Sequence, residues 1–277
     1  MLHPAGPALP AQSALFLIPL RYARISSMHI TEVTTKSALV RSRIPGVEYV
    51  INPYIGCGHG CRYCYAVFMR KYSRSHQNTE WGRFVEVKTN ITEILRSELS
   101  RKRKTGAAML SSVCDPYQPA EQRYRLTRGC VEALRDHGWR INILTRSPLV
   151  TRDLELLKTC IDVSVGFSIP TDDDGVRRIL EPCSPSIPAR IEALRRVHEA
   201  GIRTWVFIAP VLPMSPQRLV ERILPYIDHA MVDPLNYRGQ VAALFRRQGW
   251  ENALTDAYAA QTGAELARYL GAKGRRD

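Results

Sequence analysis

The 277-residue sequence contains no run of the roughly 18 apolar residues that a membrane-spanning helix requires. The apolar stretch within residues 11–20 has no basic residue before it, which argues against a secretory signal peptide. The histidines are scattered singly and none shows the spacing of metal ligands. We therefore expect a cytoplasmic protein with no membrane partner.

Acidic residues are scarce relative to basic ones. The chain has 26 Asp and Glu against 39 Lys and Arg, a formal net charge of +13 and an isoelectric point near 9.7. One interpretation is a basic enzyme with solvated Lys and Arg faces. The other is a surface that attracts nucleic acid or another polyanion, because phosphate neutralisation supplies most non-specific affinity. Charge alone does not separate the two.

Cysteine usage excludes a disulfide framework. Such frameworks take an even number of cysteines in a short secreted chain, whereas this chain has seven, three of them within eight residues. The pattern suits a reducing cytosol, with metal or cluster ligation by the three crowded residues.

From Met28 onward, short β-branched runs alternate with helical patterns. The predicted strands are 47–55, 84–89, 107–114, 140–145, 162–169, 203–212 and 230–233. The predicted helices are 62–73, 91–102 (with Asn90 as N-cap), 126–136, 151–159, 187–200 and 216–227. About seven βα units with apolar strands predict an α/β fold, with a parallel sheet covered by helices or closed as a barrel. Functional groups then gather at the carboxyl ends of the strands.

Three segments follow from this pattern. Residues 1–27, rich in Ala and Pro, are expected to be a disordered extension or translated sequence upstream of a start at Met28. Residues 28–235 carry the βα units. Residues 236–277 are expected to form a helical extension with a basic tail.

The segment NPYIGCGHGCRYCYA places Cys57, Cys61 and Cys64 in a C-x3-C-x2-C pattern. One loop thereby supplies three thiolates, the ligands that iron–sulfur clusters take, and a four-iron cluster would keep one iron without a protein ligand. A zinc site with His59 as fourth ligand is an alternative, although a histidine so close in the loop would strain a tetrahedron. A coincidental group of free thiols is another.

The pattern C-x3-C-x-aromatic-C, with Tyr63 as the aromatic residue, resembles the signature of the radical S-adenosylmethionine (SAM) superfamily. The longer segment resembles the branch related to spore photoproduct lyase. Four further segments also resemble that branch, namely VKTN (which contains Lys88–Asn90), CDPYQPAE (114–121), LTRS (144–147) and EPCSPSIPAR (181–190). The resemblance covers roughly residues 45–235. It implies a partial (β/α) barrel of about six to seven βα units, a [4Fe–4S] cluster and SAM as cofactors, and a flavodoxin-type or ferredoxin-type electron donor.

By this resemblance, SAM would chelate the iron that has no protein ligand. One electron from the cluster would then split SAM into methionine and a 5′-deoxyadenosyl radical. The residues expected to contact the cofactors are Tyr63, Lys88, Asn90, Arg146, Ser168, Ala209 and Val211. Arg146 would pair with the SAM carboxylate, because a guanidinium suits bidentate contact. The usual Gly-Gly-Glu is absent near Lys88. Pro210 cannot donate a backbone hydrogen bond beside adenine, so a neighbour must do so.

Cys114 is a candidate hydrogen donor. In spore photoproduct lyase a cysteine in the corresponding strand donates hydrogen to the product radical, and matching Asp115 to that enzyme's aspartate puts its donor at Ser112 here. Cys114 follows two residues later and would face the same side of a strand. The alternative is a buried packing residue. Glu181 and Arg190 are expected to pair before a helix.

The sequence thus predicts an enzyme that generates a 5′-deoxyadenosyl radical and abstracts hydrogen from a substrate. Basicity and the resemblance favour nucleic acid, with a DNA photoproduct lyase as the sharpest version. The shifted cysteine and the short C-terminal region argue against the same lyase reaction. A non-catalytic Fe–S protein that binds nucleic acid, and modification of a protein or small molecule, stay open.

Overall fold

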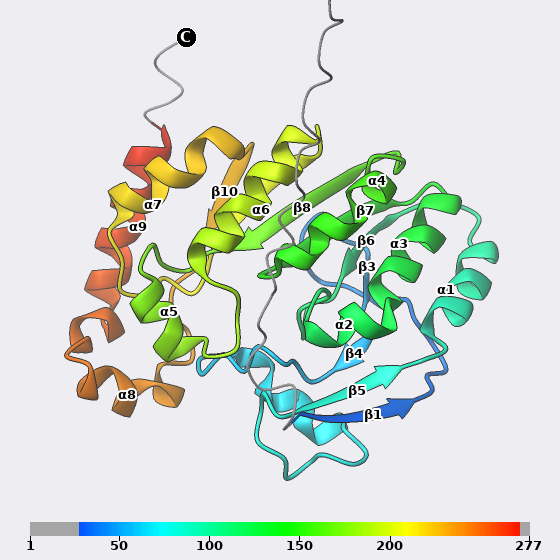
Figure 1. Ribbon diagram of the computed structural model, residues 1–277, viewed down its shortest axis with the longest axis horizontal. Coiled ribbons are helices and arrows are strands. Elements are labelled where there is room, and N and C mark those ends of the chain that lie inside the picture. Colours follow the sequence, from blue (N-terminus) through cyan, green and yellow to red (C-terminus); the bar gives the residue numbers. More distant parts are fainter. Residues whose placement is uncertain (1–27, 272–277) are drawn as a thin grey trace, which may run out of the picture.

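The computed structural model describes residues 28–271, so the segments 1–27 and 272–277 lie outside it. A seven-stranded sheet forms the centre of the molecule (Figure 1). Its strands, in sheet order, are β10 (His229–Val232), β9 (Arg203–Ile208), β8 (Val163–Ser168), β7 (Arg140–Thr145), β6 (Ala107–Leu110), β3 (Tyr49–Ile51) and β2 (Val40–Arg41). The strands from β10 to β3 are parallel, and β2 is antiparallel to β3.

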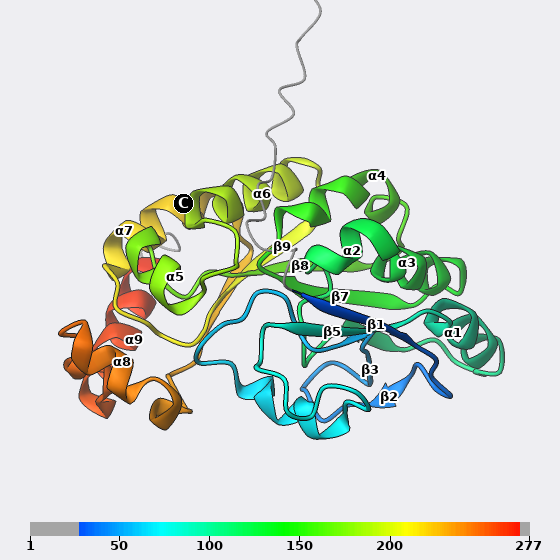
Figure 2. The ribbon, with the colours of Figure 1, turned by 60° about the horizontal axis from the view of Figure 1, so that its bottom comes forward.

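Helices connect the parallel strands, as such connections require a crossover. They are α1 (Ile91–Ser100), α2 (Pro119–Tyr124), α3 (Leu126–Asp136), η3 (Pro148–Asp153), α4 (Leu154–Leu157), α5 (Asp174–Leu180), α6 (Ile187–Glu199), α7 (Pro216–Ile223) and η4 (Leu224–Tyr226). Figure 2 shows α2, α4 and α6 on one side of the sheet, and the cyan segment with η2 (Tyr65–Tyr72) on the other. This arrangement confirms the predicted α/β fold class.

One predicted strand of the main sheet belongs to another sheet. The run at 84–89 forms β5 (Phe84–Lys88), which pairs with β1 (His29–Val33) in parallel and with β4 (Tyr54–Ile55) in antiparallel orientation. The prediction of about seven strands in one sheet was therefore wrong by this strand. Alternating apolar residues indicate a strand but do not identify its partner.

The predicted strand 47–55 is interrupted. It forms β3 and β4, which lie in different sheets and are separated by Asn52 and Pro53. Pro53 has no backbone N–H to contribute to a ladder. The side chain of Asn52 accepts a hydrogen bond from the backbone N–H of Ser112 (3.0 Å). The bend thus turns the chain out of the main sheet just before the cysteine loop.

The predicted helix at 62–73 begins later than expected and is a 3₁₀ helix, η2. The predicted N-cap of α1 was also wrong in its contacts. Asn90 stands at the cap position without a side-chain cap hydrogen bond. Its amide instead accepts from the backbone N–H of Thr35 (2.8 Å) and donates to the carbonyl of Thr35 (3.0 Å).

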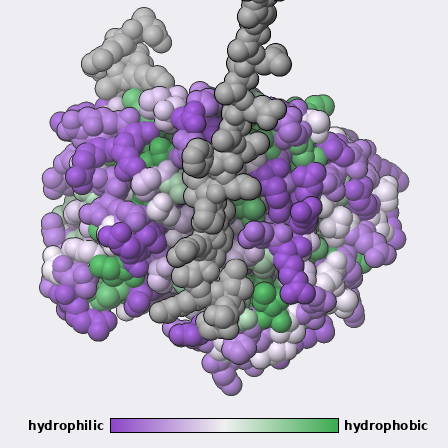
Figure 3. All heavy atoms as spheres, viewed as in Figure 1, coloured by the Kyte–Doolittle hydropathy of each residue, from purple (hydrophilic) through white to green (hydrophobic). Residues whose placement is uncertain are grey.

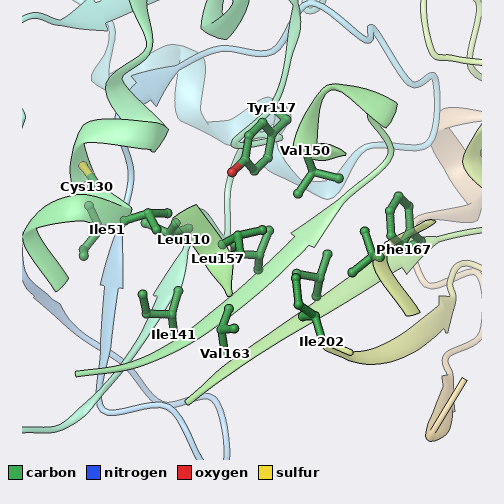
Figure 4. Close-up of a cluster of buried hydrophobic side chains, with 14 of the residues drawn as sticks. Ile51, Leu110, Tyr117, Cys130, Ile141, Val150, Leu157, Val163, Phe167 and Ile202 are labelled. Carbon is green, nitrogen blue, oxygen red and sulfur yellow. The ribbon is translucent and has the colours of Figure 1, made fainter. Parts of the chain in front are cut away.

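The main hydrophobic core lies between the sheet and its helices. Figure 4 shows Ile141, Val163 and Phe167 on the strands, facing Val150 and Leu157 from the connecting segments. All five are buried. Apolar burial of this kind is the main favourable contribution to folding, and it fixes the strands whose ends carry the site.

The C-terminal segment packs against the βα units. It contains η5 (Arg238–Gln240), α8 (Ala242–Arg247), η6 (Glu251–Leu254) and α9 (Asp256–Gly271). Leu266 of α9 is fully buried in the main core, and Tyr258 Oη donates to the carbonyl of Leu212 (3.1 Å). Within residues 28–271, no helix is long and apolar enough to span a membrane. In Figure 3 the coloured surface is mostly hydrophilic, with small separate hydrophobic areas.

Candidate active site at the carboxyl edge of the sheet

The three crowded cysteines lie on a tight loop that follows β4. Gly56 enters the loop with φ +87°, and a Cβ at this position would lie 2.3 Å from the carbonyl oxygen of Phe84. Only glycine combines this conformation with so close an approach. Cys57, Cys61 and Cys64 are all free thiols, and the first two are buried.

The thiols lie within electrostatic range of one another. Burial raises the pKa of Cys57, and the neighbouring Asp115 and Cys61 raise it further. Burial likewise raises the pKa of Cys61 to about 12, with Cys64 among the groups that contribute. Cys61 is therefore an electrostatic neighbour of both other ligand candidates. A coordinated metal would favour the deprotonated thiols, as it does for any coordinating cysteine.

The donor set fits a multi-iron cluster better than a single ion. Among residues 28–271, no three Cys, His, Asp or Glu side chains converge as the ligands of one metal ion do. Thiolates that bind three different irons of a cluster need not converge on one point. Moreover, the Nε2 atom of buried His59 lies 3.2 Å from Asp115 Oδ2. These contacts argue against zinc with His59 as fourth ligand.

Asp115 connects the cysteine loop to the ends of β6 and β7. Its carboxylate accepts hydrogen bonds from Thr145 Oγ1 (2.6 Å) and from the backbone N–H groups of Arg146 (2.7 Å) and Tyr117 (2.9 Å). The His59 contact is an ion-pair separation rather than a well-aligned hydrogen bond. Burial opposes ionisation of Asp115, but His59 and these donors lower its pKa to about 2.

A buried polar network lies beside the second cysteine and consists of Tyr63, Arg146, Glu181 and Arg190. Glu181 accepts hydrogen bonds from Tyr63 Oη and Arg146 Nε (3.1 Å) on one oxygen and from Arg190 on the other. Arg190 also donates to the carbonyl of Ser168 (3.0 Å). Burial opposes ionisation of Glu181, but the two arginines lower its pKa to about 2. The predicted Glu181–Arg190 pair is thus confirmed.

The network is in contact with the cysteine loop. Cys61 Sγ lies 3.9 Å from Ser184 Oγ, in the loop that follows α5. Arg146 Nη2 lies 3.4 Å from Tyr63 Oη, and the Arg146 side chain is 20% exposed. The guanidinium is thereby fixed beside Cys61 while one side of it still reaches solvent.

Cys114 lies near the cysteine loop, although not for the predicted reason. β6 ends at Leu110, and Ser111 adopts φ +65°, so Cys114 is beyond the strand and strand alternation does not apply. Its Sγ lies 2.7 Å from Ser111 Oγ and 3.6 Å from the carbonyl of Tyr54. Burial raises the pKa of Cys114 to about 12. Its thiol also contributes to the raised pKa of Cys57, which indicates that the two are neighbours.

The segment that contains Trp81 and Gly82 packs against the cysteine loop. The adjacent Gly82 packs on Gly60, and a Cβ on Gly82 would lie 2.6 Å from the Gly60 Cα. The buried Nε1 atom of Trp81 makes no well-aligned hydrogen bond within the described chain. Burial raises the pKa of Cys64, and the backbone N–H of Ala66, the charge of Arg146 and the nearby Trp81 side chain oppose this rise. The indole N–H therefore lies next to the third thiol.

Comparison with known proteins places this site in a family. A profile described as the radical SAM superfamily matches residues 51–223, which include the cysteine loop and the ends of β6 to β9. The chain belongs to the radical SAM superfamily.

Relatives of this radical SAM protein are largely uncharacterized. A protein of Methanocaldococcus jannaschii is 37% identical over 215 residues, covering 77% of this chain and 80% of the relative. A protein of Mycobacterium tuberculosis is 36% identical over 218 residues, covering 74% of this chain and 63% of the relative. A radical SAM Nalpha-GlyT isomerase of Pseudomonas phage M6 is 30% identical over 162 residues, or 58% of this chain and 32% of the isomerase.

Solved structures share the radical SAM fold at low sequence identity. A spore photoproduct lyase mutant superposes with a TM-score of 0.64 at 16% identity, covering 97% of this chain and 85% of the lyase. A complex of that lyase with AdoMet and dinucleoside spore photoproduct gives 0.61 at 16% identity, with the same coverage. SuiB from Streptococcus suis, bound to its precursor peptide, gives 0.54 at 16% identity over 81% of this chain and 46% of SuiB. These likenesses establish the fold.

The radical SAM fold brings most of the predicted cofactor residues to one edge of the sheet. Arg146 follows β7, Ser168 ends β8, and Ala209 and Val211 follow β9. The backbone N–H of Val211 is engaged by the carbonyl of Asp233 (3.0 Å), which leaves it no hydrogen for a cofactor. Tyr63 is buried and reaches Arg146 through the network.

Lys88 and Asn90 lie at the end of β5, in the smaller sheet. Burial lowers the pKa of Lys88 against the opposing effects of Cys114 and Glu86, so the lysine lies near Cys114. The amide of Asn90 is occupied by Thr35 on both sides. Lys88 thus lies near Cys114 and Asn90 is bonded to Thr35, and the cofactor contact expected of each stays a prediction.

The sequence did not identify two supports of the site, His59 as a partner of Asp115 and Trp81 as a neighbour of Cys64. For His59 the sequence carries a partial indication, because this residue lies inside the cysteine motif. For Trp81 the signal was weaker, because a tryptophan preceding a glycine and a strand is not distinctive. Both contacts depend on how loops fold over one another.

Proposed function

We propose that the chain is an enzyme that holds a [4Fe–4S] cluster on Cys57, Cys61 and Cys64. When bound, the cluster would supply the electron that splits SAM into methionine and a 5′-deoxyadenosyl radical, which abstracts hydrogen from a substrate. The observation that carries the proposal is the loop itself. It holds three free, mutually close thiols with no fourth cysteine in the motif, within a radical SAM match that spans the site.

The residues around the loop have separate tasks in this proposal. Arg146 would bind the SAM carboxylate, since its present bonds to Glu181 and Tyr63 use only two of its five N–H donors. Ser168 and the backbone at Ala209 would line the remaining cofactor path. Burial of Tyr63 and Glu181 would exclude water from this side of the pocket.

Cys114 would be available as a hydrogen donor. Its high pKa keeps the thiol protonated at neutral pH, and an S–H group is what hydrogen-atom donation requires. A flavodoxin-type or ferredoxin-type protein would supply electrons. Fold neighbours carry a dinucleoside photoproduct in one case and a peptide in another, so the fold alone does not select a substrate.

Electron paramagnetic resonance on anaerobically reconstituted, dithionite-reduced protein tests the proposal. We expect a reduced four-iron signal that changes when SAM is added, because SAM would bind the iron without a protein ligand. Cys61→Ala should lose the signal and the bound iron. Cys160→Ala, which changes a half-buried thiol in the turn after α4, should keep both. A signal insensitive to SAM would leave a non-catalytic Fe–S protein, and failure to take up iron would return zinc to consideration.

A further inference from the structure

An exposed row of aromatic side chains begins directly after the cysteine motif. It consists of Tyr65, Phe68 and Tyr72 on η2, together with Tyr237 beyond β10, and is called the aromatic row below. These side chains are 44%, 43%, 58% and 52% exposed. The ring centroids lie 6.3 Å apart for Tyr65 and Phe68 and 6.5 Å apart for Phe68 and Tyr72. Four large rings that face solvent together call for a binding role.

The aromatic row lies across the opening between the two ends of the parallel sheet. Tyr65 immediately follows Cys64, and its hydroxyl donates to the carbonyl of Ser112 beyond β6. Its ring stacks on that of Tyr237, with centroids 6.4 Å apart. Because β3 and β10 are at opposite ends of the parallel strands, this contact spans the open side of the partial barrel. The row therefore starts at the proposed cluster loop and continues along η2, which lies in the cyan part of the ribbon in Figure 2.

Two stretches of the chain that meet through Tyr65 and Tyr237 contain basic residues and no acid of their own, although Asp256 pairs with Arg238 of the second stretch. Residues 49–79 contain Arg62, Arg70, Lys71 and Arg74 but no Asp or Glu. Residues 234–250 likewise contain three arginines and no acid. Lys71 Nζ lies 5.8 Å from the centroid of Phe68 and 5.0 Å from that of Tyr72, so a cation accompanies the rings. Lys71 and Arg74 thus supply positive charge beside the rings of η2.

We propose that the aromatic row binds a single-stranded nucleic acid, with unpaired bases stacked on Phe68 and Tyr72 and phosphates near Lys71 and Arg74. This inference rests on the proposed function and names its substrate class. Exposed rings interleaved with cations are what sequence-tolerant single-strand binding requires, because every base has a π-face and every linkage a charge. Paired bases in a duplex would present no free face to the rings.

An acidic electron-donor protein is the competing occupant. Positive charge alone would attract it, whereas four exposed rings that begin directly after Cys64 are better explained by a substrate with π-faces of its own. An experiment can distinguish the two occupants. If nucleic acid is the occupant, its binding depends on the rings even when no redox partner is present.

The test measures binding of a fluorescent single-stranded oligonucleotide, and of the matching duplex, to the full chain by anisotropy. We expect the single strand to bind at least about tenfold more tightly than the duplex. Replacing Phe68 and Tyr72 by Ala should weaken single-strand binding by about tenfold or more for each ring. Lys71→Gln with Arg74→Gln should weaken it and reduce the slope of log affinity against log salt by about 1.4.

The control variants remove comparable charged or apolar side chains at positions outside the aromatic row. Arg103→Gln with Lys104→Gln removes equal charge from the exposed turn after α1, and Ile161→Ala removes an exposed apolar side chain before β8. Both should bind the oligonucleotide as the wild-type chain does. Equal affinity for strand and duplex, or full binding by the ring variants, would overturn the proposal. The proposal would also be overturned if the ring variants bound the oligonucleotide normally and lost only their reduction by a flavodoxin.

Failure of the proposed function gives a different result. Oligonucleotide binding needs neither SAM nor electrons, so it can be scored independently of SAM cleavage by dithionite-reduced wild-type protein. Binding that depends on the rings, without SAM cleavage, would retain the nucleic-acid surface and remove the radical enzyme. SAM cleavage without such binding would retain the enzyme and remove the substrate class.

Discussion

At the scale of single residues, the surroundings of each thiol matter as much as the thiols. Trp81 places a buried indole N–H next to Cys64, and hydrogen bonds to the sulfurs are among the factors that set the reduction potential of iron–sulfur clusters. Such a donor stabilises the more negative, reduced state. In the proposed cluster, Trp81 would therefore influence how strong a reductant is needed.

Trp81→Phe removes this donor while it keeps an aromatic ring in the loop. We expect a normal iron content and a midpoint potential shifted to more negative values, as measured by redox titration followed by paramagnetic resonance. Trp250→Phe, which alters an indole packed on Phe245 in the C-terminal segment, is the control and should leave the potential in place. A midpoint that does not move in Trp81→Phe would show that the indole makes no bond to the ligand.

Glu181→Ala leaves Arg190 buried without its carboxylate. Both side chains are fully buried, and removing one partner of such a pair typically costs about 3–5 kcal/mol. We expect a loss of this size in the free energy of unfolding from urea titration. Glu155→Ala removes the exposed partner of Lys158 and should change stability by less than about 0.5 kcal/mol. Similar losses in the two variants would refute the role given to the buried network.

What the sequence revealed at this scale follows from how local the signal is. The three cysteines lie in one short motif, so a cluster on them could be predicted from the sequence alone, and it stays a prediction. The Glu181–Arg190 pair was also within reach, because the two residues flank one loop. His59 and Trp81 were not, since each touches its partner only after separate loops have folded together.

At the scale of elements, the cysteine loop depends on the path of its backbone. Gly56 has a positive φ and lies against the Phe84 carbonyl of β5, whereas Gly46 has a similar φ of +74° with no atom within 4 Å of a Cβ. Comparing the two glycines therefore distinguishes the effect of a positive φ from the effect of a close neighbouring atom.

Gly56→Ala should therefore fail where Gly46→Ala does not. The new methyl group would collide with a backbone oxygen that cannot move without displacing β5. We expect much reduced iron uptake on reconstitution and a lower melting temperature for Gly56→Ala, with only a small loss for Gly46→Ala, which shares the left-handed conformation. Equal iron content in both variants would contradict this account of the loop.

Element prediction succeeded where periodicity and helix ends were clear, as for β7, α6 and β8. It failed for the partners of elements. The alternation at 84–89 indicates a strand equally well in either sheet, and the sequence Asn52-Pro53 interrupts a run whose side chains still favour a strand. The turn at Ser111 was hidden because a serine with positive φ has no distinctive sequence signal.

At the scale of the whole molecule, the C-terminal segment completes the core. Leu266 is fully buried among residues of the βα units, and its helix is held further by Tyr258. The expected boundary near residue 236 therefore separates elements that share a core. Composition changes there, but the packing does not stop.

Leu266→Ala should consequently destabilise the whole chain and not only α9. Truncating a buried leucine costs about 2–5 kcal/mol. We expect one unfolding transition in urea, with its midpoint lowered equally for circular dichroism and for tryptophan fluorescence. Gln261→Ala on the exposed face of α9 should leave the midpoint nearly unchanged. Two separate transitions would show that α9 unfolds independently.

Net charge was also available from the sequence, but its location was not. The count of 39 basic and 26 acidic residues left a solvated surface and a polyanion site equally open. Only the fold shows that the acid-free stretches 49–79 and 234–250 meet at the opening, through Tyr65 and Tyr237.

The second hydrophobic cluster has a consequence for the order of events during synthesis. Cys61 and Tyr63 lie early in the chain, yet the apolar side chains that cover them are Val176, Leu180, Leu212, Leu235, Val241, Phe245 and Ala253. A ribosome delivers these residues long after the cysteine loop has emerged. The apolar cover of Cys61 and Tyr63 is therefore complete only after residue 253 has been synthesised.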